Sequence, residues 1–105
     1  MLASDSGEAE LDTLRRKIDI VDDELLELLR KRFDLVLKVW VFKAENNIPS
    51  LQQDRWEQVL ADKRLKAERL GLDGEMVADI WNSIHKVAVD VENSIKARIN
   101  WDNNV

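Results

Sequence analysis

The sequence contains no cysteine, one proline, three glycines and one histidine in 105 residues. Without cysteine the chain can form no disulfide, thiolate nucleophile or cysteine-based zinc site. Its single histidine, His85, leaves little material for a metal site, so we expect no metal. Strands joined by tight turns need more glycine and proline than this chain supplies. These shortages favour an all-α fold.

Long apolar runs and a surplus of positive charge are also missing. No stretch approaches the ~18 consecutive apolar residues of a transmembrane span. The N-terminus lacks the basic start and apolar stretch of a signal peptide. The net charge of −5 argues against a general nucleic-acid binder. With 45% hydrophobic and 35% charged residues, the chain is predicted to be one soluble cytoplasmic domain without a membrane or nucleic-acid partner.

The few helix-breaking residues cluster at two places and divide the chain into three predicted helices. Asn47 tolerates the left-handed conformation that ends helices, and Pro49 disfavours helical angles in the residue before it. Gly71 followed by an apolar residue is typical of a second helix end, and Asp73 is a cap for the next helix. With Asp12 as the first cap, we expect helices at about 12–46, 51–70 and 74–99.

Ser50, with Gln53 three residues later, resembles a capping box at the start of the second helix. The helical domain is predicted to span residues 11–99. Flexible ends are expected at 1–10 and 100–105.

Apolar residues in the first predicted helix recur at spacings that alternate between three and four, which is typical of a coiled-coil-like contact. This apolar seam consists of Leu11, Leu14, Ile18, Val21, Leu25, Leu28, Leu35, Val39 and Phe42. Arg32 occupies the seam position between Leu28 and Leu35. A guanidinium there is costly unless it meets an anion or reaches water. Its partner could be a carboxylate of the protein or an anionic ligand.

The length of the first helix predicts a second copy of the chain. A helix of about 35 residues is about 50 Å long, whereas a globule of this size has a radius of gyration of about 13 Å. A homodimer would cover the seam economically. Lys43 follows Arg32 by about three turns and projects from nearly the same face. Arg15 lies about 26 Å from Arg32 along the axis, so it could share a small ligand only from a second, antiparallel chain.

The second and third helices show weaker patterns. Leu51, Val59, Leu60 and Leu70, with Trp56 beside them, form the expected core of the second helix. The third is expected to bury Val77, Ile80, Ile84, Val87, Val91 and Ile95. Glu92 flanks this apolar stripe, where a carboxylate is hard to ionise unless it is paired or reaches water. His85 is expected to be an ordinary polar residue at the edge of the core.

Five short segments follow one another in an order and spacing that resembles the all-helical (AroQ-type) chorismate mutases and their relatives. They are Leu14-Arg15-Arg16-Lys17-Ile18-Asp19, Leu28-Leu29-Arg30-Lys31-Arg32, Phe42-Lys43-Ala44, Ile48-Pro49 and Asp54-Arg55. The resemblance covers roughly residues 11–95. No single segment is specific. The ordered set of three arginines and one lysine, with a loop proline before the last arginine, is considerably more specific to this family than any one segment.

The resemblance implies an intertwined three-helix homodimer with two active sites, each built from both chains and binding a small dicarboxylate. Arg15 matches the arginine that the partner chain contributes, in agreement with the distance argument. Arg32 and Arg55 match arginines that hold the substrate's carboxylates and order the pocket. Lys43 matches the lysine that donates to the ether oxygen. Glu92 falls where many members have glutamine and some have glutamate, also facing that oxygen.

The reaction that the resemblance implies explains why arginine, lysine and glutamate side chains are enough for catalysis. Chorismate rearranges to prephenate in one pericyclic step that breaks a C–O bond and forms a C–C bond, so no nucleophile, metal or cofactor is required. The planar guanidinium group of an arginine can bind a carboxylate through two parallel hydrogen bonds. A preorganised Lys43 stabilises the negative charge that builds on the ether oxygen. Glu92 could help only as a protonated donor, which predicts activity that falls as the pH rises through its titration and a flatter profile in Glu92→Gln.

Three positions depart from the family pattern. Gln52 and Trp56 replace carboxylates near the ring hydroxyl of chorismate, and Ala88 replaces a serine. Glu57 supplies the missing carboxylate if the helix register differs. The departures leave open a 4-amino-4-deoxychorismate mutase, whose substrate could meet Trp56 through a cation–π contact.

They also leave open an isochorismate-pyruvate lyase, which breaks the same ether bond without forming the C–C bond. Chorismate mutase is the favoured interpretation. A non-catalytic helical dimerisation module is the alternative of another class, and it requires Arg32 to pair with a carboxylate of the protein.

Overall fold

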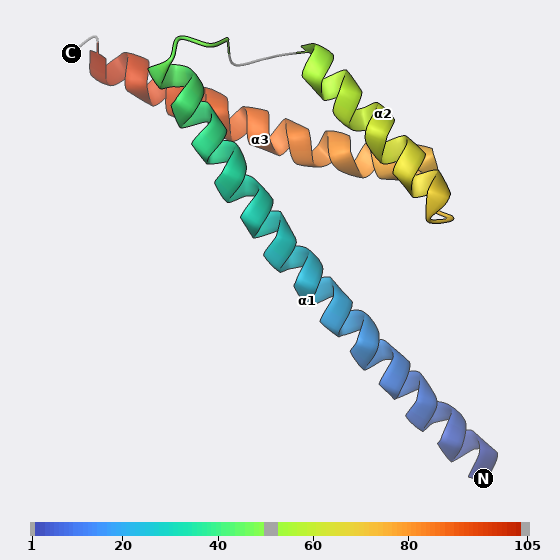
Figure 1. Cartoon of the computed structure of the whole chain (residues 1–105). Helices are drawn as coiled ribbons and strands as arrows, with labels where there is room; N and C mark the ends of the chain where they lie inside the picture. The colour runs from blue at the N-terminus through green and yellow to red at the C-terminus, as the bar shows by residue number, and fades with distance from the viewer. Residues whose placement is uncertain (1, 50–52, 104–105) are drawn as a thin grey trace. The chain divides into compact units, whose positions relative to one another are not determined.

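The computed structural model describes the backbone of residues 2–49 and 53–103, and the side chains of residues 7–49 and 53–97. This part of the chain forms three helices, α1 (Leu2–Glu45), α2 (Gln53–Arg69) and α3 (Gly74–Asn103), as Figure 1 shows. No strand occurs in these ranges, so the predicted all-α class is confirmed. The described residues fall into two compact units, one ending at Leu35 and one beginning at Val36.

Helix α1 begins at Leu2, so the prediction that the first helix starts at an Asp12 cap is wrong. The Asp12 side chain lies within the helix, and its Oδ1 is 3.8 Å from Nη1 of Arg15, one turn later. The residues before Asp12 include leucine, alanine and glutamate, which are strong helix formers, and no proline. The helix extends through this stretch to Leu2, and Gly7 does not interrupt it.

The end of α1 follows the predicted chemistry. Asn47 adopts the left-handed conformation with a φ of 55°. This turn lets the Ile48 N–H donate a 2.9 Å hydrogen bond to the Lys43 carbonyl, which would otherwise lack a helical partner. The expected Ser50 cap lies outside the described residues, as does Leu51.

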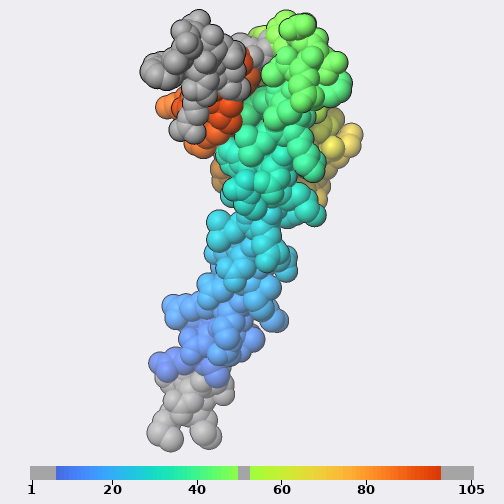
Figure 2. All heavy atoms as spheres, turned by 90° about the vertical axis from the view of Figure 1, so that its left-hand side faces the viewer, coloured from blue at the N-terminus to red at the C-terminus, as the bar shows by residue number. Residues whose placement is uncertain are grey.

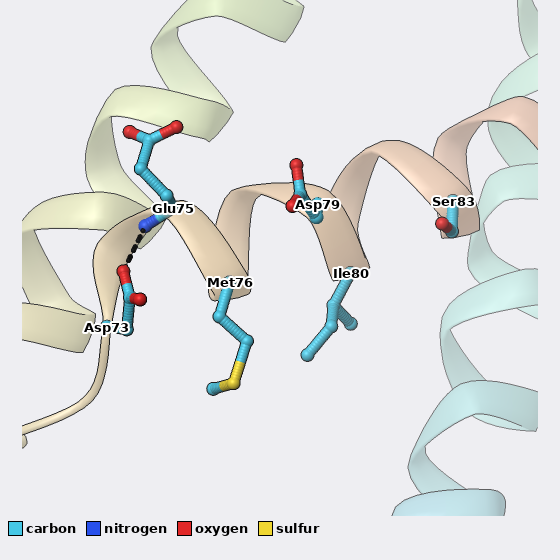
Figure 3. A pocket seen from close by; sticks show the side chains of 6 residues that line it. All are labelled: Asp73, Glu75, Met76, Asp79, Ile80 and Ser83. Atoms are coloured by element: carbon cyan, nitrogen blue, oxygen red, sulfur yellow. Dashed lines mark hydrogen bonds between the residues drawn. The ribbon is translucent and has the colours of Figure 1, made fainter.

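The turn between α2 and α3 confirms the predicted stop and start signals. Gly71 has a φ of 75°, and Leu72 N–H donates to the Ala67 carbonyl at 2.8 Å, which completes a Schellman motif. Asp73 then caps α3, because its Oδ1 accepts a 2.9 Å hydrogen bond from the Glu75 N–H (Figure 3). The two helices converge at this turn, as Figure 1 shows.

Small side chains form the core between α2 and α3. The buried apolar residues of the described chain are Ala67, Val77, Ala78 and Ala88. Small residues let the two helix backbones approach closely, and polar contacts join them around this core. The Arg64 Nε lies 3.1 Å from Oε1 of Glu75, and the Lys63 ammonium lies 5.9 Å from the centre of the Trp81 ring.

The apolar seam of α1 is exposed along its whole length. Its nine side chains retain between 45% and 59% of their accessible surface. No described side chain of the unit that ends at Leu35 is buried, and Figure 2 shows this stretch at the molecular surface. The described apolar side chains of this unit are therefore not buried by the unit itself.

The predicted core of α3 is only partly formed. Val77 is buried and Ile84 is half-buried, but Ile80, Val87, Val91 and Ile95 are exposed, with 40% to 52% of their surface accessible. The short α2 covers only the first part of α3, since the small core residues lie between Val77 and Ala88. Within the described residues, no helix carries a stretch long and apolar enough to cross a membrane.

Candidate functional site

A pocket of about 400 Å³ lies within the unit that begins at Val36. The last turns of α1, the residues that follow it and the later half of α3 form its walls. Its lining residues are Leu37, Trp40, Val41, Lys43, Ala44, Glu45, Asn47, Ile48, Glu92, Ile95 and Lys96. Apolar side chains supply most of this wall. A few charged side chains lie between the apolar ones, and this combination is typical of sites that bind small molecules.

The end of α1 positions Lys43. This lysine is half-buried in the last turn of the helix, where a positive charge is favoured by the helix dipole. The left-handed Asn47 turns the chain back, so that Asn47 and Ile48 join Lys43 in the same pocket wall. The stop signal of the helix thus also shapes the pocket.

Helix α3 contributes Glu92, which is the one buried charged residue in the part of the chain with described side chains. Its side chain retains 9% of its accessible surface, and its Oε1 lies 3.2 Å from the ammonium of Lys96, one turn later. The predicted apolar setting of Glu92 is therefore confirmed. Its ion-pair partner is Lys96, a residue that was not among the predicted site residues.

The structure brings two of the predicted site residues, Lys43 and Glu92, into one pocket. The other predicted site residues whose side chains are described are not among its lining residues. Arg15 is exposed and Arg32 is half-buried, both on the part of α1 before Val36. Arg55 is exposed on α2.

Two of the three positions that depart from the family pattern, Trp56 and Ala88, have described side chains. Ala88 is buried, with 3% of its surface accessible. Gln52 lies outside the described residues. Trp56 contacts α3 through two residues that the sequence analysis did not assign to the site. Its indole Nε1–H donates a 3.2 Å hydrogen bond to Asn82, and its ring stacks on His85 with 3.8 Å between centroids and 12° between planes. These contacts fix the orientation of the indole.

A second hollow, of about 420 Å³, lies at the start of α3 (Figure 3). Its polar wall consists of Asp73, Glu75, Asp79 and Ser83, beside the apolar Met76 and Ile80. Three carboxylates repel an anion, so this hollow does not suit a dicarboxylate. No group of three or more potential ligands in the described chain is arranged to hold a metal ion.

Comparison with known proteins places this geometry in context. Residues 14–93 match the family described as chorismate mutase type II. The chain is 36% identical over 85 residues to the T-protein of Enterobacter agglomerans, which covers 81% of this chain and 23% of that protein. Against the T-protein of Haemophilus influenzae, it is 34% identical over 70 residues, or 67% of this chain and 19% of that protein. The chain thus spans about a quarter or less of the T-proteins that it matches.

Two shorter relatives carry another name. The 4-amino-4-deoxychorismate mutase of Streptomyces pristinaespiralis is 31% identical over 74 residues, or 70% of this chain and 57% of that protein. Its counterpart from Streptomyces venezuelae is 28% identical over 89 residues, or 85% of this chain and 86% of that protein. No solved structure matches the chain.

Proposed function

The chain belongs to the type II chorismate mutase family, and we propose that it catalyses the rearrangement of chorismate to prephenate as an intertwined homodimer. The observation that carries this proposal is the pocket that Lys43 and Glu92 share. In the reaction the ether C–O bond breaks while a C–C bond forms within the same molecule. Atoms and electrons balance without a co-reactant, so the protein's task is to position the substrate and stabilise charge.

Lys43 is proposed to donate to the ether oxygen. Negative charge develops on this oxygen as the C–O bond breaks, so an ammonium group at the site stabilises the transition state more than the ground state. Apolar walls strengthen this effect, because they replace water with a medium of lower dielectric constant. Half-burial in the last turn of α1 already restricts the Lys43 side chain before substrate arrives.

The substrate's two carboxylates need further cations. The pocket itself carries two ammonium groups, on Lys43 and Lys96, and two carboxylates, on Glu45 and Glu92, so its charges cancel. We propose that Arg32, Arg55 and, from the partner chain, Arg15 supply the missing positive charge. Their rigid guanidinium forks suit bidentate recognition of carboxylates.

Dimerisation is proposed from the exposed seam. A lone amphipathic helix is marginally stable in water, since most helical stability in proteins comes from packing of the apolar face. Nine apolar side chains along α1 remain about half exposed, and the unit that ends at Leu35 has no buried side chain. A second copy would bury this apolar surface, and its isologous contact would bring two copies of α1 together. Cytoplasmic location stays a prediction from the sequence.

The test of the proposed function is an assay of the purified chain with three substrates in parallel: chorismate, isochorismate and 4-amino-4-deoxychorismate. Loss of the near-ultraviolet absorbance of chorismate, with prephenate as the identified product, is the expected result. Pyruvate and salicylate from isochorismate would indicate the lyase instead. No turnover of any of the three would favour the non-catalytic dimerisation module.

A second candidate is 4-amino-4-deoxychorismate mutase activity. Two relatives with this name match the chain, one of them over 86% of its own length. In addition, Trp56 occupies a position where the family resemblance implies a carboxylate near the substituent that distinguishes the two substrates. Its indole is held by Asn82 and His85, and a fixed aromatic face can accept an ammonium group through a cation–π contact.

The variant Trp56→Leu separates the two candidates, because it removes the aromatic face without adding a charge. If Trp56 recognises an amino substituent, this variant is expected to lower the ratio of kcat/KM for the amino substrate to that for chorismate about fivefold to thirtyfold. The ratio is measured by competition between the two substrates. Trp81→Leu serves as a control, because Trp81 lies on α3 and contacts Lys63 instead. An unchanged ratio in Trp56→Leu would remove Trp56 as the determinant.

A further inference from the structure

We propose that Asn82 and His85 are positioning residues that hold the Trp56 indole as a fixed wall beside the substrate and thereby set which ring substituent the enzyme prefers. This inference rests on the proposed function, because it gives the indole a substituent to discriminate. It adds two residues of α3 that were not among the predicted site residues. His85, expected from the sequence to be an ordinary polar residue, receives a specific role.

Two contacts of different kinds restrict the indole. Its Nε1–H donates a 3.2 Å hydrogen bond to Oδ1 of Asn82. Its ring stacks on the imidazole of His85, with 3.8 Å between the centroids and 12° between the planes. The stack fixes the plane of the indole, and the hydrogen bond fixes its rotation within that plane. A tryptophan side chain has two rotatable bonds, so contacts at one face and one edge restrict both.

Both holding residues belong to the same helix. Asn82 and His85 are three residues apart on α3, so their side chains are neighbours on its surface. Trp56 comes from the first turns of α2, which packs against α3, and its side chain is half-buried. Because the imidazole occupies one face of the indole, a substrate group must approach the other face.

The stack lies on the side of α3 that leads to the pocket. Glu92 follows His85 by seven residues, which is close to two full turns, so both side chains project from the same face. The separation along the axis is about 10 Å. The buried Ala88 lies between them, where a small side chain leaves room. Helix α2 begins at Gln53, only three residues before Trp56, so the stack lies near the start of α2. A small ring that extends along this face from Glu92 therefore meets the indole.

A fixed indole discriminates between substituents better than a mobile one. A mobile side chain loses conformational entropy when it contacts the substrate, whereas a side chain that is already held does not. The held indole presents its electron-rich face to the substituent before the substrate binds, which favours an ammonium group over a neutral hydroxyl. Loss of either holding contact therefore weakens this preference, although the indole itself remains.

The experiment compares the parent protein with His85→Leu and Asn82→Leu. Each variant is expected to lower the ratio of kcat/KM for 4-amino-4-deoxychorismate to that for chorismate about twofold to tenfold, which is less than the effect of removing the indole. His85→Phe keeps a flat ring against the indole and is expected to retain the parent ratio. In a Trp56→Leu background, His85→Leu should change the ratio no further, because the group that it positions is gone.

A second readout measures the orientation of the indole without any substrate. In nuclear magnetic resonance spectra of nitrogen-labelled protein, His85→Leu is expected to move the indole N–H resonance of Trp56, because the ring current of the imidazole is lost. Asn82→Leu is expected to speed the hydrogen exchange of the same N–H. Asn93→Leu is the matched control, since Asn93 is an exposed asparagine of α3 outside the pocket lining.

The proposal is overturned if the ratio stays at the parent value in both leucine variants, or if Asn93→Leu lowers it equally. An equal drop in His85→Phe and His85→Leu would also overturn it, because the stack would then not be what matters. All variants should keep the far-ultraviolet circular dichroism of the parent. If the parent turns over neither substrate, the proposed function fails and the specificity role fails with it, whereas the Trp56 resonance still decides whether Asn82 and His85 hold the indole.

Discussion

Replacement of Lys43 by methionine is expected to lower kcat about 100- to 1,000-fold, because it removes a preorganised donor to an oxygen that gains charge in the transition state. Methionine fills a similar volume, so the apolar wall of the pocket is preserved. The substrate's carboxylates are proposed to be held by arginines, and the KM should therefore change much less than the kcat. Steady-state kinetics of the purified variant at several pH values measures both.

Lys38→Met is the control for this prediction. Lys38 lies on the same helix, is exposed and does not line the pocket, so its loss changes the charge by the same amount without touching the site. Both variants should keep the far-ultraviolet circular dichroism and the thermal midpoint of the parent within a few degrees. A Lys43→Met variant that retains activity within about threefold of the parent would contradict the proposed role of the lysine.

The helix ends were predictable from the sequence because they depend on local chemistry. Gly71 and Asn47 adopt the left-handed backbone that their positions after the helices suggest, and Asp73 caps the helix that follows it. The start of α1 was not predictable in this way. Aspartate is tolerated inside a helix when an arginine follows one turn later, and Arg15 provides that partner for Asp12.

The candidate site was predictable in part. The family resemblance selected Lys43 and Glu92, and the structure brings both into one pocket. Lys96 was missed although its spacing of four residues from Glu92 is the signal of a helical ion pair. No comparable signal exists for the stacking of Trp56 on His85, because that contact depends on how α2 packs against α3 and not on local sequence.

The exposed seam leads to a prediction about which chains build each site. In the proposed dimer, Arg15 of one chain serves the pocket that contains Lys43 of the other. Homodimers of Arg15→Ala and of Lys43→Met are each expected to lose at least about 100-fold in kcat/KM, since both of their sites carry the defect. A mixed dimer of the two variants concentrates both defects in one site and leaves the second site intact.

The mixed dimer is therefore expected to recover about half of the parent activity, one working site of two. It can be isolated from a co-expression by two different affinity tags and assayed before the chains exchange. A mixed dimer of Arg32→Ala and Lys43→Met is the matched control, because both residues are proposed to serve the same site from one chain, and it should stay inactive. If the first mixed dimer were as inactive as its parent variants, Arg15 and Lys43 would act within one chain, and the proposed sharing of sites would be wrong.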